Sequence, residues 1–374
     1  MKGKNWLIIA LLMAMLVVRA DAAPVSDEVM QTLPNEAEEL LDELDAENYD
    51  HKTLTQGLEL LWNTVCDLFL STVRDSLGGA VLILGVVFLC GVAEDCFRAA
   101  GNEKTPNYVP MAGALAITLI AAGNMRSLIG LGIDTVEQLD IFAKALLPTL
   151  AAAVAASGGM ISAGVKQVST VFFTNLLISL IHNILLPLVY CYIASAAMDA
   201  MLPQARLKKI AEGLRKAVTW ILTGSLALFT GYLTLSGGVT GSADALSAQL
   251  ARSAIATAVP VVGGIISDAT GTVLAGAGVL KNGIGIFGML AVLAICLLPF
   301  LRLAVQYLLY KLTAFFSGTV GSESLVELID ALGSAFGLVL GMVGTGALLL
   351  LISIASTVSV VMTRWNGFVH GFSA

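Results

Sequence analysis

The chain has 374 residues, of which 57% are hydrophobic and 13% charged, and its formal net charge is −7. Soluble domains carry about 25% charged residues, so this composition excludes an ordinary soluble globular protein. Many of the apolar residues occur in runs that approach the roughly 20 helical residues needed to cross a hydrocarbon core. The sequence therefore predicts an all-α, polytopic membrane protein.

The first 23 residues have the order of a secretory signal peptide. Two lysines precede an apolar stretch, which ends in small residues around Ala22 and Ala23. We expect cleavage after one of these two alanines. The alternative is an uncleaved signal anchor, because Arg19 interrupts the end of the apolar stretch. In either case the residues that follow are expected outside the cytoplasm.

Residues 24–76 form the predicted extracytoplasmic segment. Its acidic part, up to Asp50, is expected to be mobile. Apolar positions then recur at spacings of three and four residues, which predicts an amphipathic helix: Leu54, Leu58, Leu61, Val65 and Leu68. Its apolar stripe has three alternative positions: on the membrane surface, against a partner helix, or against the chain's own bundle. We favour the last.

Residues 77–374 are predicted to form a transmembrane helical bundle. Eight apolar segments are candidates, at 77–93, 108–123, 141–162, 168–197, 217–236, 254–280, 284–309 and 331–362. Several of them contain proline or clustered glycines. The sequence therefore predicts seven or eight membrane segments, some of them broken helices.

Charge placement suggests an orientation for this bundle. The loop at 198–217 carries the strongest positive cluster, so it is expected in the cytoplasm. The loop at 313–330 carries three acids in its second half and is expected outside, which places the C-terminus inside. Four crossings before 198–217 would violate this parity, so one segment must not cross. The best candidate is 141–162, as a re-entrant hairpin that ends in small residues.

A shift of 112 residues superposes two pairs of prolines, Pro148 with Pro260 and Pro187 with Pro299. It suggests an internal repeat that relates 141–236 to 253–348. An inverted repeat would place the two charged loops on opposite sides, as in several transporter folds. It would also require 141–162 to cross, against the parity argument, and both alternatives stay open at this point.

The most unusual segment runs from Pro260 to Lys281. It combines a proline, five glycines and Asp268 inside an apolar run, and a carboxylate there is expected to face other helices or water. Asp268, Thr270, Thr272 and Lys281 are therefore candidates for a polar lining or an ion-coupling site. The alternative is a buried acid satisfied by hydroxyls and backbone groups. His182, in the span 168–197, is a second candidate.

Small and helix-breaking residues suggest where helices pack and bend. Glycines at spacings of three and four let helix backbones approach closely, and the candidates are Gly263, Gly264, Gly276, Gly278, Gly285, Gly288, Gly337 and Gly341. The candidate hinges are Pro148, Pro187, Pro260 and Pro299. A phosphate-binding loop is excluded, because no Gly-Lys-Ser/Thr follows these glycines.

The sequence contains no recognisable catalytic or metal-binding motif. Its three histidines do not form HExxH, and neither a GxSxG elbow nor clustered carboxylates within a span are present. We therefore expect no enzyme activity and no cofactor. The acidic segment argues against nucleic acid as a partner, because both carry negative charge.

The run from Val259 to Asn282, followed by Gly285-Ile-Phe-Gly288, resembles the stage III sporulation protein AE family. The likeness covers nearly the whole mature chain and is most specific between 255 and 290. It implies a membrane component of the channel complex between mother cell and forespore, located in the mother-cell membrane around the forespore. It carries over no catalytic residue.

The resemblance also implies partners: other stage III sporulation membrane proteins, ring-forming intermembrane proteins and a secretion-type ATPase. A homo-oligomer is a further expectation. Two alternative functions remain beside the channel subunit. One is an ion-coupled secondary transporter with inverted repeats, and the other is a structural hub that conducts nothing.

Overall fold

The computed structural model describes residues 27–42, 51–99, 108–202, 207–258, 263–319 and 321–359, and these residues form helices and no strand. In chain order the elements are α2 (Asp27–Met30), α3 (Asn35–Asp42), α4 (His51–Ala99), α5 (Tyr108–Ala156), α6 (Met160–Leu180), the π-helix η1 (Ile181–Leu185), α7 (Leu186–Met201), α8 (Lys208–Ala258), α9 (Gly263–Ser317) and α10 (Glu323–Ser359).

Among the described residues, six helical segments are long and apolar enough to cross a membrane, with α6, η1 and α7 counted as one. The all-α, polytopic fold is therefore confirmed. The predicted seven or eight segments roughly agree with these six. The difference arises because pairs of predicted segments share a helix: 108–123 and 141–156 both lie on α5, and most of 254–280 lies with 284–309 on α9.

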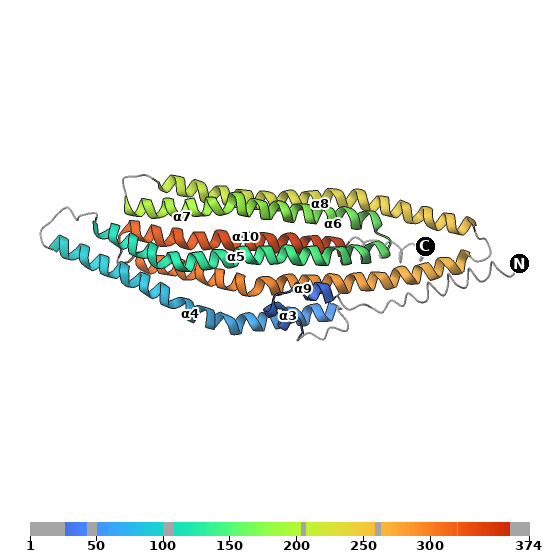
Figure 1. The fold of residues 1–374 in the computed structure, drawn as a ribbon, viewed down its shortest axis with the longest axis horizontal. Coiled ribbons are helices and arrows are strands. Elements are labelled where there is room, and N and C mark those ends of the chain that lie inside the picture. The colour runs from blue at the N-terminus through green and yellow to red at the C-terminus, as the bar shows by residue number, and fades with distance from the viewer. Residues whose placement is uncertain are drawn as a thin grey trace.

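Long helices that follow one another in the chain run antiparallel in an elongated bundle (Figure 1). α10 and α5 lie between a layer of α6, α7 and α8 on one side and α9 and α4 on the other. One hydrophobic core connects them, and its largest fully buried side chains include Phe142, Phe229, Phe287, Tyr310 and Phe336. α4, with 49 residues, is about 74 Å long at 1.5 Å per residue, so it exceeds a hydrocarbon core of about 30 Å.

The segment 141–162 is not a re-entrant hairpin, and that expectation is wrong. Residues 141–156 are the last turns of α5, which continues through Pro148 without a break. The turn at 157–159 follows, where Gly158 has a φ of 92°, a conformation that glycine adopts without strain. Three passes, by α4, α5 and α6–α7, thus precede the basic loop, so the parity conflict disappears.

The two charged loops lie at the same end of the bundle, which contradicts their predicted placement on opposite sides. Lys208, at the start of α8, forms an ion pair with Glu327 in the first turns of α10. The hairpins α7–α8 and α9–α10 therefore turn in the same direction. If 141–236 and 253–348 are a repeat, these hairpins are not inverted with respect to each other.

The acidic N-terminal segment packs on the bundle from Asp27 to Asp42, although we expected it to be mobile. Val29, Leu33, Ala37 and Leu41 are all buried. Ala37 and Leu41 are four residues apart and lie on one face of α3, while Glu36 and Glu39 stay exposed. This apolar stripe is present in the sequence, but the surrounding acids obscure it. The signal peptide at 1–23 lies outside the described residues.

The predicted amphipathic helix forms the first half of α4, and it packs on the chain's own bundle as favoured. Val65, Leu68 and Val73 contact a small cluster on α9 made by Leu301, Val305 and Leu309. The opposite side of α4 exposes large apolar side chains, among them Trp62 and Leu70.

Candidate functional site

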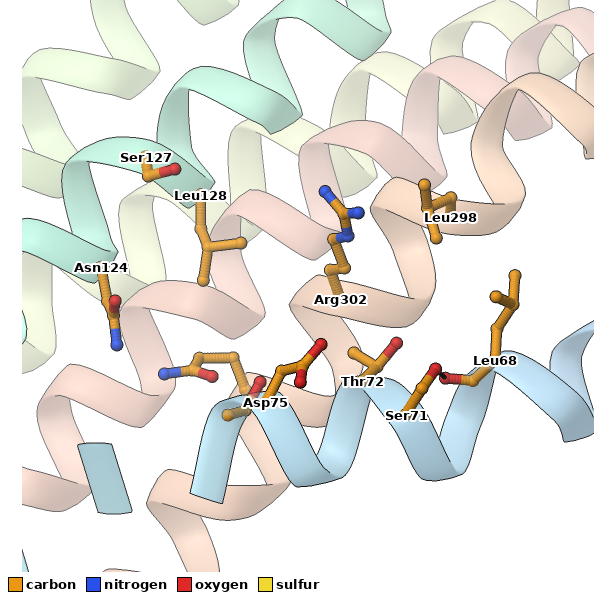
Figure 2. Close-up of a pocket in the computed structure, with 11 residues that line it drawn as sticks. Leu68, Ser71, Thr72, Asp75, Asn124, Ser127, Leu128, Leu298 and Arg302 are labelled. Atoms are coloured by element: carbon orange, nitrogen blue, oxygen red, sulfur yellow. Dashed lines mark hydrogen bonds between the residues drawn. The ribbon is translucent and has the colours of Figure 1, made fainter. Parts of the chain in front are cut away.

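A polar pocket lies between α4, α5 and α9, about midway along the bundle (Figure 2). It has a volume of about 320 Å³. Eight of its eleven lining residues are polar, and they come from all three helices: Ser71, Thr72, Asp75 and Ser76 on α4, Asn124 and Ser127 on α5, and Arg302 and Gln306 on α9.

The pocket borders the most apolar span of the chain. That span covers Gly278–Ser317 of α9, and its most apolar 18-residue stretch has a mean hydropathy of 2.7, the highest among the described helices. The rings of Phe142 on α5 and Phe287 on α9 lie 6.5 Å apart, and a Cβ built on Gly132 would contact Leu303. α5 from about 124 to 146 therefore runs beside α9 from about 306 to 288. Arg302 and Gln306 of the pocket lie within this candidate membrane span of α9.

Arg302 and Asp75 give the pocket its charge. Each would cost about 2.5–3.5 kcal/mol at the centre of a helix surrounded by lipid. Both side chains are exposed on the protein surface at the pocket rather than buried in the core. Figure 2 shows the guanidinium of Arg302 pointing up from α9 and Asp75 on α4 facing the pocket from below. Such groups are stable there if water fills the pocket.

Close helix packing fixes the walls of the pocket. A Cβ on Gly79 of α4 would lie 3.3 Å from the side-chain nitrogen of Asn124 on α5. The apolar contacts of Val65, Leu68 and Val73 hold α4 against α9 along one edge. The polar groups on α4 lie beside these contacts, on a neighbouring strip of the helix. The amphipathic spacing that we assigned to packing therefore also lines the pocket.

The residues predicted around Asp268 are only partly described. Asp268, Thr270 and Thr272 lie within α9, but their side chains are outside the described residues. Gly263, Gly264 and Gly276 also lie within α9, and their packing likewise falls outside what the structure describes. Pro260 also lies outside the described residues. Lys281 is 1% exposed, and its Nζ donates a hydrogen bond of 2.6 Å to the carbonyl oxygen of Val358.

A second buried lysine, which the sequence analysis missed, lies near Lys281. Lys166 on α6 is 2% exposed, and it donates to the carbonyl oxygen of Ser356 and, at 2.9 Å, to its hydroxyl. Both ammonium groups thus bind the last carbonyls of α10, where the helix dipole favours positive charge. Lys166 stands alone in an apolar run, which is the signal that could have identified it.

His182 lies on the π-helix η1, which directly precedes α7. Pro187 is the second residue of α7. Nε2 of His182 lies 3.1 Å from Oε1 of Glu137 on α5, and the two side chains are 39% and 52% exposed. π-helical turns occur often at functional sites. His182 and Lys281 therefore lie in different parts of the bundle, and neither lines the polar pocket.

Among the predicted packing glycines, two lie at the tightest helix contacts. A Cβ on Gly285 would be 2.3 Å from Val358, and one on Gly288 would be 2.5 Å from Leu146. Gly337 and Gly341 face Tyr307 and Leu222 at 3.1 and 3.6 Å, whereas Gly278 has no atom within 4 Å. Gly132, which we did not predict, is as tight as Gly288, since its Cβ would lie 2.5 Å from Val339.

The predicted hinges behave differently from one another. Pro148 and Pro299 lie inside the continuous helices α5 and α9. Pro187 is in the first turn of α7, directly after the π-helix. Only Pro187 therefore accompanies a change of helix type among the described prolines of this set.

A larger charged pocket of about 890 Å³ opens at the loop end of the bundle. Residues of both the α7–α8 hairpin and the α9–α10 hairpin line it. Its charged lining residues are of both signs: Asp199, Lys208, Glu212, Arg215, Lys311, Glu323, Glu327 and Asp330. Lys311 donates to Asp330 at 2.6 Å and to Ser334 at 2.9 Å. Within the described part of the chain, no group of three His, Cys, Asp or Glu residues could hold a metal ion.

Comparison with known proteins gives one family. The family model of stage III sporulation protein AE matches residues 38–361. Stage III sporulation protein AE of Bacillus subtilis strain 168 is 24% identical over 259 residues, which are 69% of this chain and 64% of that protein. The match thus spans just under two thirds of the relative's length. No solved structure matches the chain.

The family supports a role in sporulation, and the six apolar helices support a multi-pass membrane protein. The matched region includes all of the described helices from α4 to α10, and it begins within α3. It therefore contains the polar pocket. The chain therefore belongs to the stage III sporulation protein AE family.

Proposed function

We propose that this chain is a membrane subunit of a transport complex that links mother cell and forespore. The observation that carries the proposal is the polar pocket, because it places Arg302, Asp75 and Gln306 beside the most apolar span of the chain. Polar side chains at that depth are expensive in lipid and typical of solute or ion pathways. Membership of a sporulation family supports the cellular setting.

The partners in this proposal are other stage III sporulation membrane proteins, ring-forming intermembrane proteins and a secretion-type ATPase. The mother-cell membrane around the forespore is the proposed location, with the N-terminal segment outside the cytoplasm. Because three passes separate that segment from the basic loop, its extracytoplasmic position is compatible with a cytoplasmic basic loop. The subunit has no enzymatic role in this proposal.

The test replaces the chromosomal gene with an Arg302→Gln variant. Glutamine keeps hydrogen-bonding capacity but removes the charge, so we expect heat-resistant spore yield to fall at least ten-fold while the membrane abundance of the protein is unchanged. Arg74→Gln on α4 is the matched control, since Arg74 is exposed but does not line the pocket. Normal spore yield for Arg302→Gln would reject a functional role of the pocket.

A non-conducting hub is the second candidate, and the charged pocket at the loop end favours it. Its mixed charges would suit a polar partner surface. If Arg302→Gln is silent while Glu212→Gln or Glu323→Gln reduces recovery of the partner proteins from solubilised membranes, the hub explains the chain better. The inverted-repeat transporter loses its geometric basis, since the two charged loops lie at one end.

A further inference from the structure

The outer face of α5 carries a stripe of polar residues that the polar pocket does not include. Its charged members are Arg126, Asp134, Glu137 and Lys144, all exposed, and the partly exposed Gly130 and the exposed Ile141 lie on the same arc. At 100° per residue these positions fall within about 80° of the helix circumference. Met125, Ile129, Gly132, Val136 and Leu139, which are buried in the core, lie on the opposite side of the helix.

The outer stripe of α5 lies at the level of the apolar spans. Gly132, on the buried side of α5 at the level of the middle of the stripe, faces Val339 and Val343 near the centre of the α10 span and Leu303 in the α9 span. From Arg126 to Lys144 the stripe is about 27 Å long at 1.5 Å per residue, which is close to the thickness of the hydrocarbon core. The stripe is therefore long enough to cross nearly the whole bilayer.

The outer surface of α8 at this level carries large apolar side chains. On α8, which is aligned with α10 through the contact of Leu222 with Gly341, Leu228 is 71% and Leu235 is 77% exposed. These side chains suit lipid. The two central acids of the α5 stripe, Asp134 and Glu137, do not suit lipid at the same depth.

We propose that the outer stripe of α5 lines a water-filled lumen enclosed by several copies of this chain, which passes hydrated ions or small polar solutes. The proposal rests on the transport role proposed above and locates the path on α5 instead of on the segment around Asp268.

Symmetry favours a lumen over direct contact between copies. In a ring of identical subunits, the same residue of every copy lies at the same membrane depth. Asp134 would then face its own counterpart, and like charges in direct contact repel each other. Glu137 is partnered within the chain, since its Oε1 lies 3.1 Å from Nε2 of His182. Water between the copies removes this repulsion. Open space at the stripe agrees with this, since a Cβ on Gly130 would have no atom within 4 Å.

Cysteine accessibility in sporulating cells tests the lumen. Gly130→Cys, Asp134→Cys and Glu137→Cys are introduced singly into the full chain after the five native cysteines have been replaced by alanine. The probe is a membrane-impermeant cationic methanethiosulfonate. Leu228→Cys on α8 is the matched control, because it is exposed at the depth of Glu137 on a surface that suits lipid. Leu235→Cys, about 10 Å further along α8, is a second exposed apolar control.

We expect the three stripe positions to react at least ten-fold faster than the two α8 positions. Equal rates would overturn the proposal, because the stripe would then be covered by protein or lipid. Efficient disulfide formation between two Glu137→Cys copies without labelling would also overturn it in favour of direct contact. Spore yield is measured separately for each variant. If the stripe is not labelled but Arg302→Gln still prevents sporulation, the lumen is rejected and the transport role stands.

Discussion

Single residues determine how closely the helices of this bundle approach one another. Gly132 and Gly288 lie where α5 crosses α10 and α9, and a methyl group at either position would collide with a neighbouring side chain. In a bilayer, helix association depends on such close packing because lipid gives little hydrophobic drive. The tightest contacts of α5 are therefore made by residues without side chains.

Gly132→Ala is expected to lower the stability of the bundle. The new Cβ would lie 2.5 Å from Val339 Cγ1, so a core side chain must move, and overpacking of this kind costs about 1–3 kcal/mol. The measurement is the thermal unfolding midpoint in detergent.

Gly130→Ala, two residues earlier on the same helix, is the matched control. Its Cβ would meet nothing, and alanine favours a helix over glycine by about 1 kcal/mol, so its midpoint should stay unchanged or rise. A Gly132→Ala midpoint equal to that of Gly130→Ala would contradict the described contact between α5 and α10.

The buried lysines show what single-sequence reasoning could and could not find. Lys281 was predicted as polar company for Asp268, but its ammonium group instead binds the end of α10, 77 residues away in sequence. Lys166 shares this role from α6. A charge in an apolar run indicates that a partner exists. It does not identify the partner, because the partner here is a backbone carbonyl of a distant helix.

At the scale of elements, α5 shows why the segment count differed from the fold. Its middle, from Asn124 to Lys144, is polar enough on average to suggest a loop between two spans. The buried face of the same stretch is continuous, with Ile129, Val136 and Leu139 in the core. An average over all faces hides this periodicity. The sequence predicted the fold class and most apolar segments, but the polar outer face of α5 concealed a single helix.

Two helices begin with the help of a carboxylate from another element. Asp244 on α8 accepts the backbone N–H groups of Ile161 and Ser162 at 2.9 and 3.0 Å, in the first turn of α6. Asp199 on α7 accepts those of Leu207 and Lys208 at 2.8 and 3.1 Å, at the start of α8. Local capping patterns do not predict either contact, because the capping residue is not adjacent in sequence to the turn it caps.

Asp244→Ala is expected to destabilise the α5–α6 turn. Asp244 is 2% exposed, so its loss leaves two amide groups of α6 without their acceptor, and removal of a capping side chain costs about 0.5–2 kcal/mol. Hydrogen exchange of the first turn of α6 should accelerate, and the unfolding midpoint should fall.

Two further variants control this result. Asp244→Asn retains one acceptor oxygen, so it should lose less stability than Asp244→Ala. Asp199→Ala removes the corresponding cap at α8, where partial exposure lets water replace it, and its effect should be smaller still. Unchanged exchange at α6 in Asp244→Ala would show that α8 does not cap that helix.

At the scale of the whole molecule, the direction of the two hairpins determines what kind of machine the bundle can be. Transporters with inverted repeats place equivalent loops on opposite sides of the membrane. Here the α7–α8 and α9–α10 turns share one end, and the charged pocket opens between them. The outer stripe of α5 and the polar pocket lie deeper, at the level of the apolar spans. Both polar regions thus belong to a bundle whose two charged hairpin turns lie at the same end.

A crosslink between Lys208→Cys and Glu327→Cys tests this arrangement directly. Because Lys208 and Glu327 meet through two long side chains, the reagent is a short bismaleimide, which spans a larger gap than a disulfide. In a chain without its native cysteines, we expect efficient intramolecular crosslinking in intact membranes.

The control pairs Lys208→Cys with Asn282→Cys, whose neighbour Lys281 contacts Val358 at the far end of α10. That pair should not crosslink, since most of the length of α10 separates its members. If the bundle were instead built from inverted repeats, the acidic loop would lie across the membrane from Lys208, and the first pair would fail. Because the Lys208–Glu327 ion pair is exposed to solvent, which screens it, its substitution should leave the fold intact, and a negative result would then reflect the position of the loops.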